Sequence, residues 1–150
     1  MTRINLIKPE KLYDQHLIAE YREIFMVPAA LKRSLKAKSG MRVDDIPKRF
    51  TLGKGHVRFF YDKGRYLYKR YALLRAEMIK RGFKPDINRK FPKDIFIENK
   101  LFNDWRPDKR ALAVIIERLR QKIAKKPDWY RKRARRKEQY EIKKQIKSFR

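Results

Sequence analysis

Residues 55–83 read GHVRFFYDKGRYLYKRYALLRAEMIKRGF, and this stretch decides the fold because it carries the longest amphipathic pattern in the chain. Its apolar side chains recur at spacings of three and four residues, which places them on one face of an α-helix. We predict one helix over about residues 56–81, ended at RGF by Gly82. The predicted buried stripe consists of Val57, Phe60, Tyr61, Leu67, Tyr68, Tyr71, Leu74 and Met78.

The segments before this stretch repeat the helical pattern. Pro9 suits a first helical turn, and the helix predicted after it, through residue 25, has Tyr13, Leu17, Tyr21 and Ile24 on one side. Leu12, Gln15, His16, Ala19, Arg22 and Glu23 share the other side. A second, shorter helix is predicted over residues 28–38, and residues 41–55 are predicted to form a loop.

The segments after this stretch complete an all-α domain. A last helix is predicted over residues 108–125, with Leu112, Ile115, Ile116, Leu119 and Ile123 facing inward. The long connection over residues 83–107 is predicted to pack on the core through Phe91, Phe96, Phe102 and Trp105. Alternating, strand-like patterns are absent from the sequence. We therefore predict a compact, single-domain, all-α fold with a long aromatic-rich loop.

The composition predicts a folded protein that binds nucleic acid. The 150 residues are 42% hydrophobic, enough for a modest core, and 43 Lys and Arg against 17 Asp and Glu give a net charge of +26. The commonest partner of such a surface is a polyphosphate. Charge alone leaves a noncatalytic DNA- or RNA-binding protein as an equal alternative.

Metal, cofactor and membrane functions are not expected. The chain has no cysteine and two histidines, which is a poor ligand set for zinc or iron. No stretch approaches the roughly 20 apolar residues of a membrane span, and the first residues lack the apolar run of a signal peptide. We expect a soluble, intracellular, cytoplasmic protein that associates with DNA as a monomer and needs no metal or cofactor.

The C-terminal end differs in composition from the rest. We divide the chain into a helical domain, residues 1–130, and a basic extension, residues 131–150. The extension is mostly cationic with few large aliphatic side chains. We expect it to act as an electrostatic arm that adds nonspecific phosphate contacts.

Few residues suggest catalysis directly. No Ser/His/Asp set is apparent, and GKG at residues 53–55 is too short for a phosphate-binding loop. Glu23 stands among Gln15, His16 and Arg22 on a cationic helix face. By itself this pattern is more typical of a solvated ion pair than of a catalytic acid. His56 is expected to cap or pack a helix.

Five blocks in register resemble a known family. MTRINL, DQHLIAEYRE, LGKGHVRFFYDK, KRGF and KPDWY are similar to the pyrimidine-dimer DNA glycosylase and abasic-site lyase family, which includes the endonuclease V of T-even phages and its viral and bacterial relatives. The resemblance runs from residue 2 to about residue 130 and is looser over residues 83–107. It implies a DNA repair enzyme acting on cyclobutane pyrimidine dimers in double-stranded DNA.

The resemblance implies a role for each matching residue. After removal of the initiator methionine, the α-amine of Thr2 attacks C1′ of the damaged nucleotide, and Glu23 is its acidic partner. The resulting imine is followed by β-elimination. The implied DNA-binding residues are Arg3, Gln15, His16, Arg22, Arg118, Lys122, Trp129 and Tyr130. For Trp129 and Tyr130, burial against the core is an equal possibility.

Elementary chemistry agrees with an α-amine as nucleophile. Only the neutral amine attacks, and an α-amino group titrates near about 8, against roughly 10.4 for lysine. One residue departs from the phage pattern, because Met26 stands where the phage enzyme has arginine. The phosphate contact of that arginine is either lost or taken over by Lys32 or Arg33, and the lesion preference can differ accordingly. A family member that prefers abasic sites or other damaged bases remains a further alternative.

Overall fold

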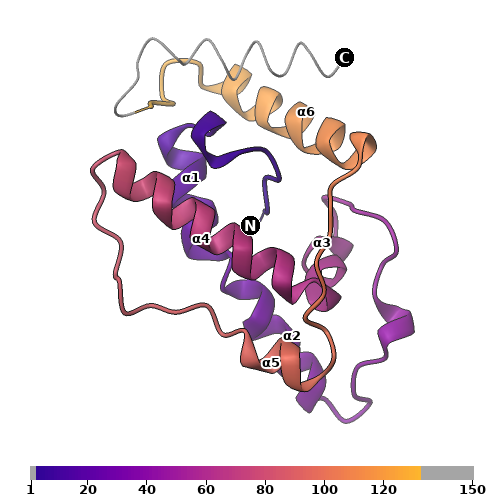
Figure 1. Ribbon diagram of the computed structural model, residues 1–150. Coiled ribbons are helices and arrows are strands. Elements are labelled where there is room, and N and C mark those ends of the chain that lie inside the picture. Colours follow the sequence, from indigo (N-terminus) through magenta and orange to yellow (C-terminus); the bar gives the residue numbers. More distant parts are fainter. Residues whose placement is uncertain (1–2, 133–150) are drawn as a thin grey trace.

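The computed structural model of the chain describes residues 3–132 (Figure 1). Thr2 and residues 133–150, which hold most of the predicted basic extension, lie outside the described residues. The elements, with η marking a short 3₁₀ turn, are η1 (Pro9–Lys11), α1 (Asp14–Glu23), α2 (Met26–Lys36), η2 (Val43–Asp45), α3 (Gly55–Phe59), η3 (Phe60–Asp62), α4 (Gly64–Lys80), α5 (Asp94–Glu98) and α6 (Lys109–Lys125).

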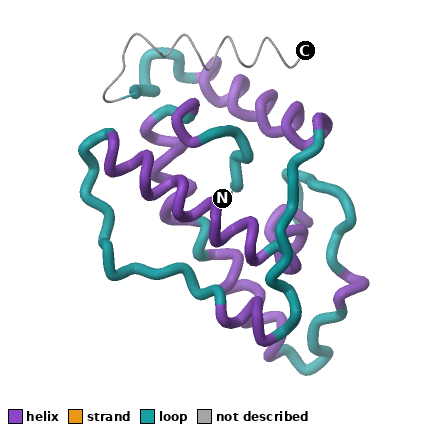
Figure 2. Tube along the Cα trace, viewed as in Figure 1, coloured by secondary structure: helices purple, strands orange, loops and turns teal. Residues whose placement is uncertain are grey.

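The prediction of an all-α fold is confirmed. Within residues 3–132 the helices are joined by loops, as Figure 2 shows, and the one pairing of strand type is an isolated antiparallel bridge between Lys63 and Phe102. None of the helices in this part of the chain combines the length and apolar character needed to cross a bilayer.

Helices α1 and α4 pack against each other at the centre of the fold. Two ion pairs join them: Arg81 to Asp14 at 3.0 Å, and Arg70 to Glu20 at 2.6 Å. Because the earlier residue of α1 meets the later residue near the end of α4, the two helices are antiparallel. Figure 1 shows the indigo N-terminal segment between α4 and α6 in this view.

The single helix predicted over residues 56–81 is wrong, because the chain turns at η3 and restarts as α4. The turn is fixed by residues far along the sequence: the Gly64 N–H donates to the Leu101 carbonyl at 3.0 Å. Gly64 also lies against the Phe96 ring so closely that a Cβ at this position would overlap its carbon atoms. Local periodicity cannot reveal such contacts. The predicted stripe is otherwise buried, except that Val57 is half-buried and Tyr68 is exposed.

Other boundaries differ from the predictions by smaller amounts. The first predicted helix is split into η1 and α1, and α2 begins at Met26, two residues before the predicted start. Leu12 and His16, predicted on the polar side, are buried. The predicted loops over residues 41–55 and 83–107 contain η2 and α5, respectively.

The predicted end of α4 is confirmed. Gly82 has a φ of 82°, its N–H donates to Ile79 O, and the Phe83 N–H donates to Met78 O. This is the hydrogen-bond pattern of a Schellman motif, in which glycine takes the left-handed conformation at the helix end.

The long connection packs on the core through its aromatic side chains, as predicted. Phe91 and Phe96 are buried and stack with ring centroids 5.9 Å apart, and Trp105 meets the Phe59 ring edge-on at 5.1 Å. The connection leads into α6, where the Asp108 carboxylate caps the helix by accepting from Ala111 N at 2.7 Å. Four of the five predicted apolar residues of α6 are buried and Leu112 is half-buried.

Gly64→Ala should destabilise the fold by about 1–3 kcal/mol, because the added methyl group has to displace the buried Phe96 ring. Gly53→Ala is the matched control, since a Cβ there would lie 3.9 Å from Thr51 Oγ1, at ordinary van der Waals distance. Urea unfolding of both variants measures the difference. A Gly64→Ala protein as stable as the Gly53→Ala protein would show that the restart of α4 tolerates a side chain.

Candidate active site

A buried ion pair holds the N-terminal segment in place. Arg70 Nε and Nη2 donate to the two carboxylate oxygens of Glu20 at 2.6 and 2.9 Å, and the side chains are 4% and 0% exposed. The same Glu20 accepts the Asn5 N–H at 3.0 Å, and the same Arg70 donates to Ile7 O at 2.5 Å. Burial lowers the pKa of Arg70, but the neighbouring Glu20 charge raises it, and the net shift is upward. Residues 5–7 are therefore fixed over α1 and α4.

His56 extends this anchoring by one residue. The Ile4 N–H donates to His56 Nε2 at 2.9 Å, so Nε2 carries a lone pair and the imidazole proton is on Nδ1. Nδ1 lies 2.9 Å from Thr51 O, to which it donates. Burial, assisted by the charges of Arg3 and Arg118 and opposed by the Thr51 hydrogen bond, lowers the pKa of His56 to about 4. His56 is thus a neutral, buried acceptor that packs in the interior, as expected.

Glu23 lies where this segment meets the end of α1. Its half-buried carboxylate makes no hydrogen bond or ion pair with any residue between 3 and 132. Arg3 and Arg118 are within its electrostatic reach: burial lowers the pKa of both guanidinium groups, and the Glu23 charge opposes that shift. Arg118 also donates to Asn5 Oδ1 at 3.5 Å. The structure thus brings two arginines and a carboxylate together at the start of the described chain.

His16 lies near Arg118 of this cluster of Arg3, Glu23 and Arg118. Its ring stacks on Tyr130 with centroids 4.6 Å apart, and Nδ1 is buried without a hydrogen-bond partner. Burial first, and then the charges of Arg118 and Lys122, lower the pKa of His16 to about 4. His16 is therefore neutral at physiological pH, and it faces Tyr130 rather than the solvent.

The WY pair divides into one exposed ring and one buried ring. Trp129 is 53% exposed, with Lys126 Nζ 5.4 Å from its ring centroid, whereas Tyr130 is 8% exposed. Gln15 clamps this segment, because its Nε2 donates to Trp129 O at 2.6 Å and its Oε1 accepts from Arg131 N at 3.0 Å. For Tyr130 the structure favours the alternative of burial.

The remaining predicted site residues lie around this cluster. Arg22 and Lys122 are exposed, and Arg89 donates to Arg22 O at 3.2 Å. Thr2, the predicted nucleophile, is outside the described residues and is bonded to Arg3. Among residues 3–132, no three His, Asp or Glu side chains gather in a way that could hold a metal ion.

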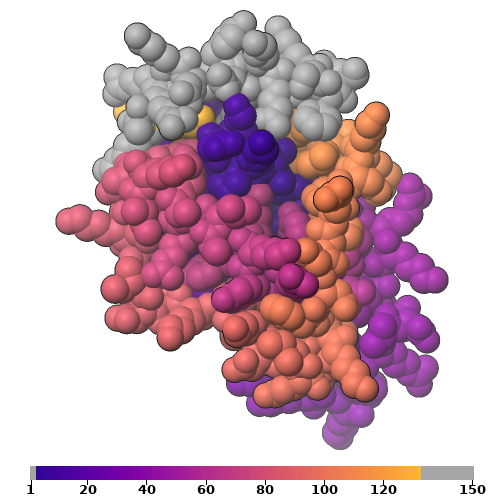
Figure 3. Space-filling model, viewed as in Figure 1, coloured from indigo at the N-terminus to yellow at the C-terminus, as the bar shows by residue number. Residues whose placement is uncertain are grey.

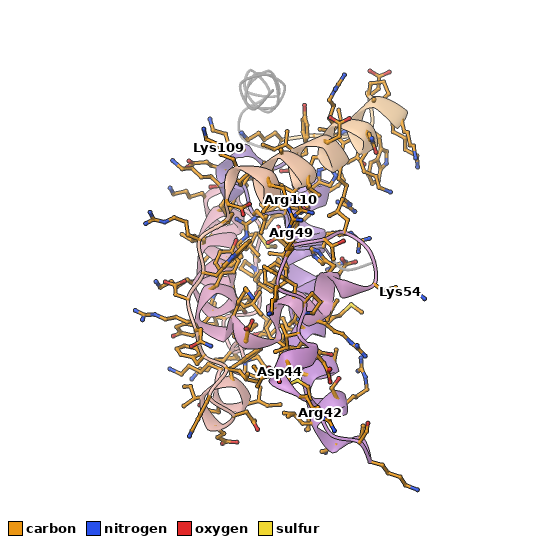
Figure 4. The ribbon with its side chains drawn as sticks, turned by 90° about the vertical axis from the view of Figure 1, so that its right-hand side faces the viewer. Arg42, Asp44, Arg49, Lys54, Lys109 and Arg110 are labelled. Carbon is orange, nitrogen blue, oxygen red and sulfur yellow. The ribbon has the colours of Figure 1, made fainter. Side chains whose placement is uncertain are left out.

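Further cations line another side of the molecule, over the loop before α3 and the start of α6. Figure 4 labels Arg42, Asp44, Arg49, Lys54, Lys109 and Arg110 on this side. Arg110 donates to Phe50 O at 2.8 Å and so ties the loop to α6.

The most important residues that sequence reasoning missed are Glu20 and Arg70. A signal was present, because each charge interrupts an apolar stripe: Glu20 lies on the buried side of α1, and Arg70 lies within the stripe of α4. A charged residue inside such a stripe is rarely buried unless it is paired.

The two buried histidines should make the fold sensitive to acid. Their pKa values of about 4 lie below the ordinary 6.5, so the unfolded chain takes up protons first as the pH falls. Stability should be complete above pH 6.5 and fall toward pH 4, by up to about 3 kcal/mol for each histidine. His56→Gln, which offers Ile4 an acceptor that does not titrate, should flatten this loss. Urea unfolding of the wild-type and His56→Gln proteins at several pH values measures this loss of stability. An equal pH dependence in the two proteins would contradict the role of His56.

A comparison with protein families gives one match. The family model described as pyrimidine dimer DNA glycosylase matches residues 1–91, which is more than half of the chain. The matched region contains α1 to α4 and therefore Glu20, Glu23, His56 and Arg70. It supports the resemblance drawn from the five sequence blocks over that range.

Proposed function

The chain belongs to the pyrimidine dimer DNA glycosylase family, and we propose that it excises cyclobutane pyrimidine dimers from double-stranded DNA as a combined glycosylase and abasic-site lyase. The observation that carries this proposal is the half-buried Glu23 carboxylate beside Arg3, at the start of a segment anchored on Glu20, Arg70 and His56. Thr2 lies outside the described residues and precedes Arg3 in the sequence, and the proposal requires its amine to act beside Glu23.

The proposed reaction begins with the α-amine of Thr2, freed by removal of Met1. The neutral amine attacks C1′ of the damaged nucleotide, and the bond from C1′ to the pyrimidine breaks. The positive charges of Arg3 and Arg118 favour the neutral amine, whereas Glu23 favours its protonated form. The Glu23 carboxylate stabilises the positive charge that develops on the sugar as the base leaves.

An imine then leads to strand cleavage. The nitrogen loses a proton, the sugar ring opens at the C1′–O4′ bond, and O4′ gains a proton, with Glu23 assisting these transfers. The imine acidifies the C2′ hydrogen, so transfer of that proton to a base, which is water or the Glu23 carboxylate, expels the 3′ phosphate and cuts the strand on the 3′ side of the attacked sugar. No cofactor takes part in this proposed route.

Among the predicted DNA-binding residues, we propose different roles for the exposed and the buried side chains. Arg22, Lys122 and the ring of Trp129 are exposed and are proposed to touch the DNA directly. His16, Gln15 and Tyr130 support that surface from behind, through the stacking and clamping contacts described above. Arg3 and Arg118 contribute charge beside Glu23.

Phosphate contacts next to the site involve α2. Met26 is 49% exposed at the start of this helix and carries no charge, while Lys32 and Arg33 are exposed further along it. These two cations are proposed to replace the phosphate contact of the phage arginine. The basic extension and the loop cations labelled in Figure 4 add nonspecific attraction, which salt weakens.

Lesion recognition is proposed to depend on the weaker base stacking at the dimer. A bulky dimer disrupts stacking, so kinking the duplex and extruding a nucleotide there costs a few kcal/mol less than in intact DNA. By similarity to the phage enzyme, the extruded base is the adenine opposite the dimer. We propose that the protein does this as a monomer.

Glu23→Gln should abolish dimer excision while leaving binding intact. The substitution keeps the shape of the side chain but removes the charge needed at the transition state, so single-turnover excision should fall by roughly 100-fold or more. Glu98→Gln is the matched control, since it removes one exposed carboxylate from α5. Excision and binding are measured on the same dimer-containing duplex.

Three results would contradict the proposal. Excision by Glu23→Gln near the wild-type rate would remove Glu23 from the mechanism. Binding without cutting by the wild-type protein would instead favour a noncatalytic DNA-binding protein. Cleavage of an abasic duplex, but not of a dimer-containing one, would favour a family member with a different lesion preference.

A further inference from the structure

A groove of about 640 Å³ lies between α4 and the segment that follows it. Figure 1 shows that this segment descends from the end of α4 and passes below it to α5, and in Figure 3 both lie on the face turned toward the viewer. Three aromatic rings, Tyr68, Tyr71 and Phe91, and three cations, Arg75, Lys90 and Lys93, line the groove. None of these six residues belongs to the site around Glu23.

The aromatic rings of the groove are held in fixed positions. Tyr71 and Phe91 are each 4% exposed, and their centroids are 6.1 Å apart. The Tyr71 hydroxyl lies 3.2 Å from the Tyr21 hydroxyl and donates to Arg89 O. The Tyr68 ring centroid lies 6.2 Å from that of Phe102, and its 40% exposure leaves the rest of the ring open to a ligand. Ala72 and Ala76, which have small side chains, also line the groove.

The charges of the groove favour an anion. Arg75 donates to Ile87 O at 3.1 Å, and Lys93 Nζ lies 5.0 Å from the Tyr68 ring centroid. Neither of these cations, nor Lys90, forms an ion pair with a carboxylate among residues 3–132, and no carboxylate lines the groove. One exposed aromatic ring, Tyr68, among cations without a carboxylate partner in this part of the chain matches a base and its flanking phosphates.

We propose that this groove binds single-stranded DNA, with an unstacked base on Tyr68 and the flanking phosphates on Lys90, Lys93 and Arg75. Double-stranded DNA fits these residues less well, because its base faces are hidden within the stack, whereas a single strand exposes them. The C-terminal residues 133–150 are a poor occupant, since eight Lys or Arg against two Glu would be repelled by the groove. This site requires neither Thr2 nor Glu23, so it is independent of the proposed excision.

The test compares a base-bearing probe with a base-free one. The full chain is titrated with a fluorescently labelled oligothymidine of about 12 nucleotides, and with an abasic oligomer of the same length made of tetrahydrofuran spacers, which have no C1′ aldehyde and so form no imine. Tyr68→Ala should weaken oligothymidine binding by roughly 10-fold and leave the abasic oligomer unchanged, because one stacking contact is lost. Tyr68→Phe should retain binding. Ile97→Ala, which truncates an exposed apolar side chain outside the groove, should bind both probes like the wild type.

Cross-linking locates the bound strand. An oligothymidine containing 4-thiothymidine should form its photo-adduct on the peptide that contains Tyr68. An adduct confined to the peptide that contains Trp129, or equal affinity of the wild-type chain for the two oligomers, would overturn the proposal. Tyr68→Ala should still excise dimers from a short duplex at the wild-type rate, and Glu23→Gln should still bind oligothymidine, so failure of either proposal is distinguishable from failure of the other.

Discussion

The buried pair of Glu20 and Arg70 is the interaction on which the rest of the structure depends. Removing two charges from water is costly, and deleting one partner of a buried pair leaves the other uncompensated, at roughly 3–5 kcal/mol. Such a pair adds little stability by itself. Here Glu20 also accepts a hydrogen bond from Asn5 N, and Arg70 also donates one to Ile7 O. Both backbone groups belong to a segment that has no helix or strand to satisfy them. The pair therefore sets the position of the N-terminal segment.

The same helices tie this segment to the carboxylate proposed for catalysis. Arg81, at the end of α4, donates to Asp14 and to Pro9 O, so both ends of α1 are joined to α4 by buried arginines. Glu23 is the last residue of α1, and its position follows from that of Glu20 one turn earlier. The region matched to the family, residues 1–91, contains this whole arrangement. These contacts thus join the N-terminal segment, α1 and its last residue, Glu23, to α4.

The sequence predicts those features of the fold that depend on local periodicity. The helical class, the end of α4 at Gly82 and the inward aromatic residues of the long connection all follow from spacing and residue type. The break before Gly64 does not, because it depends on Leu101 and Phe96. The pairing of Glu20 with Arg70 depends in the same way on how two helices pack. Spacing alone could not distinguish Glu23 from an ordinary surface carboxylate, and its proposed role came from the resemblance.

Trapping the covalent intermediate tests the central proposal most directly, namely that the N-terminal α-amine acts as the nucleophile. The protein is incubated with dimer-containing duplex DNA in the presence of borohydride, which reduces an imine to a stable amine, and the adduct is located by peptide mapping. We expect the sugar on the α-amine of Thr2, in protein from which Met1 has been removed. An adduct on a lysine side chain, or dimer excision with no trapped adduct, would contradict this account.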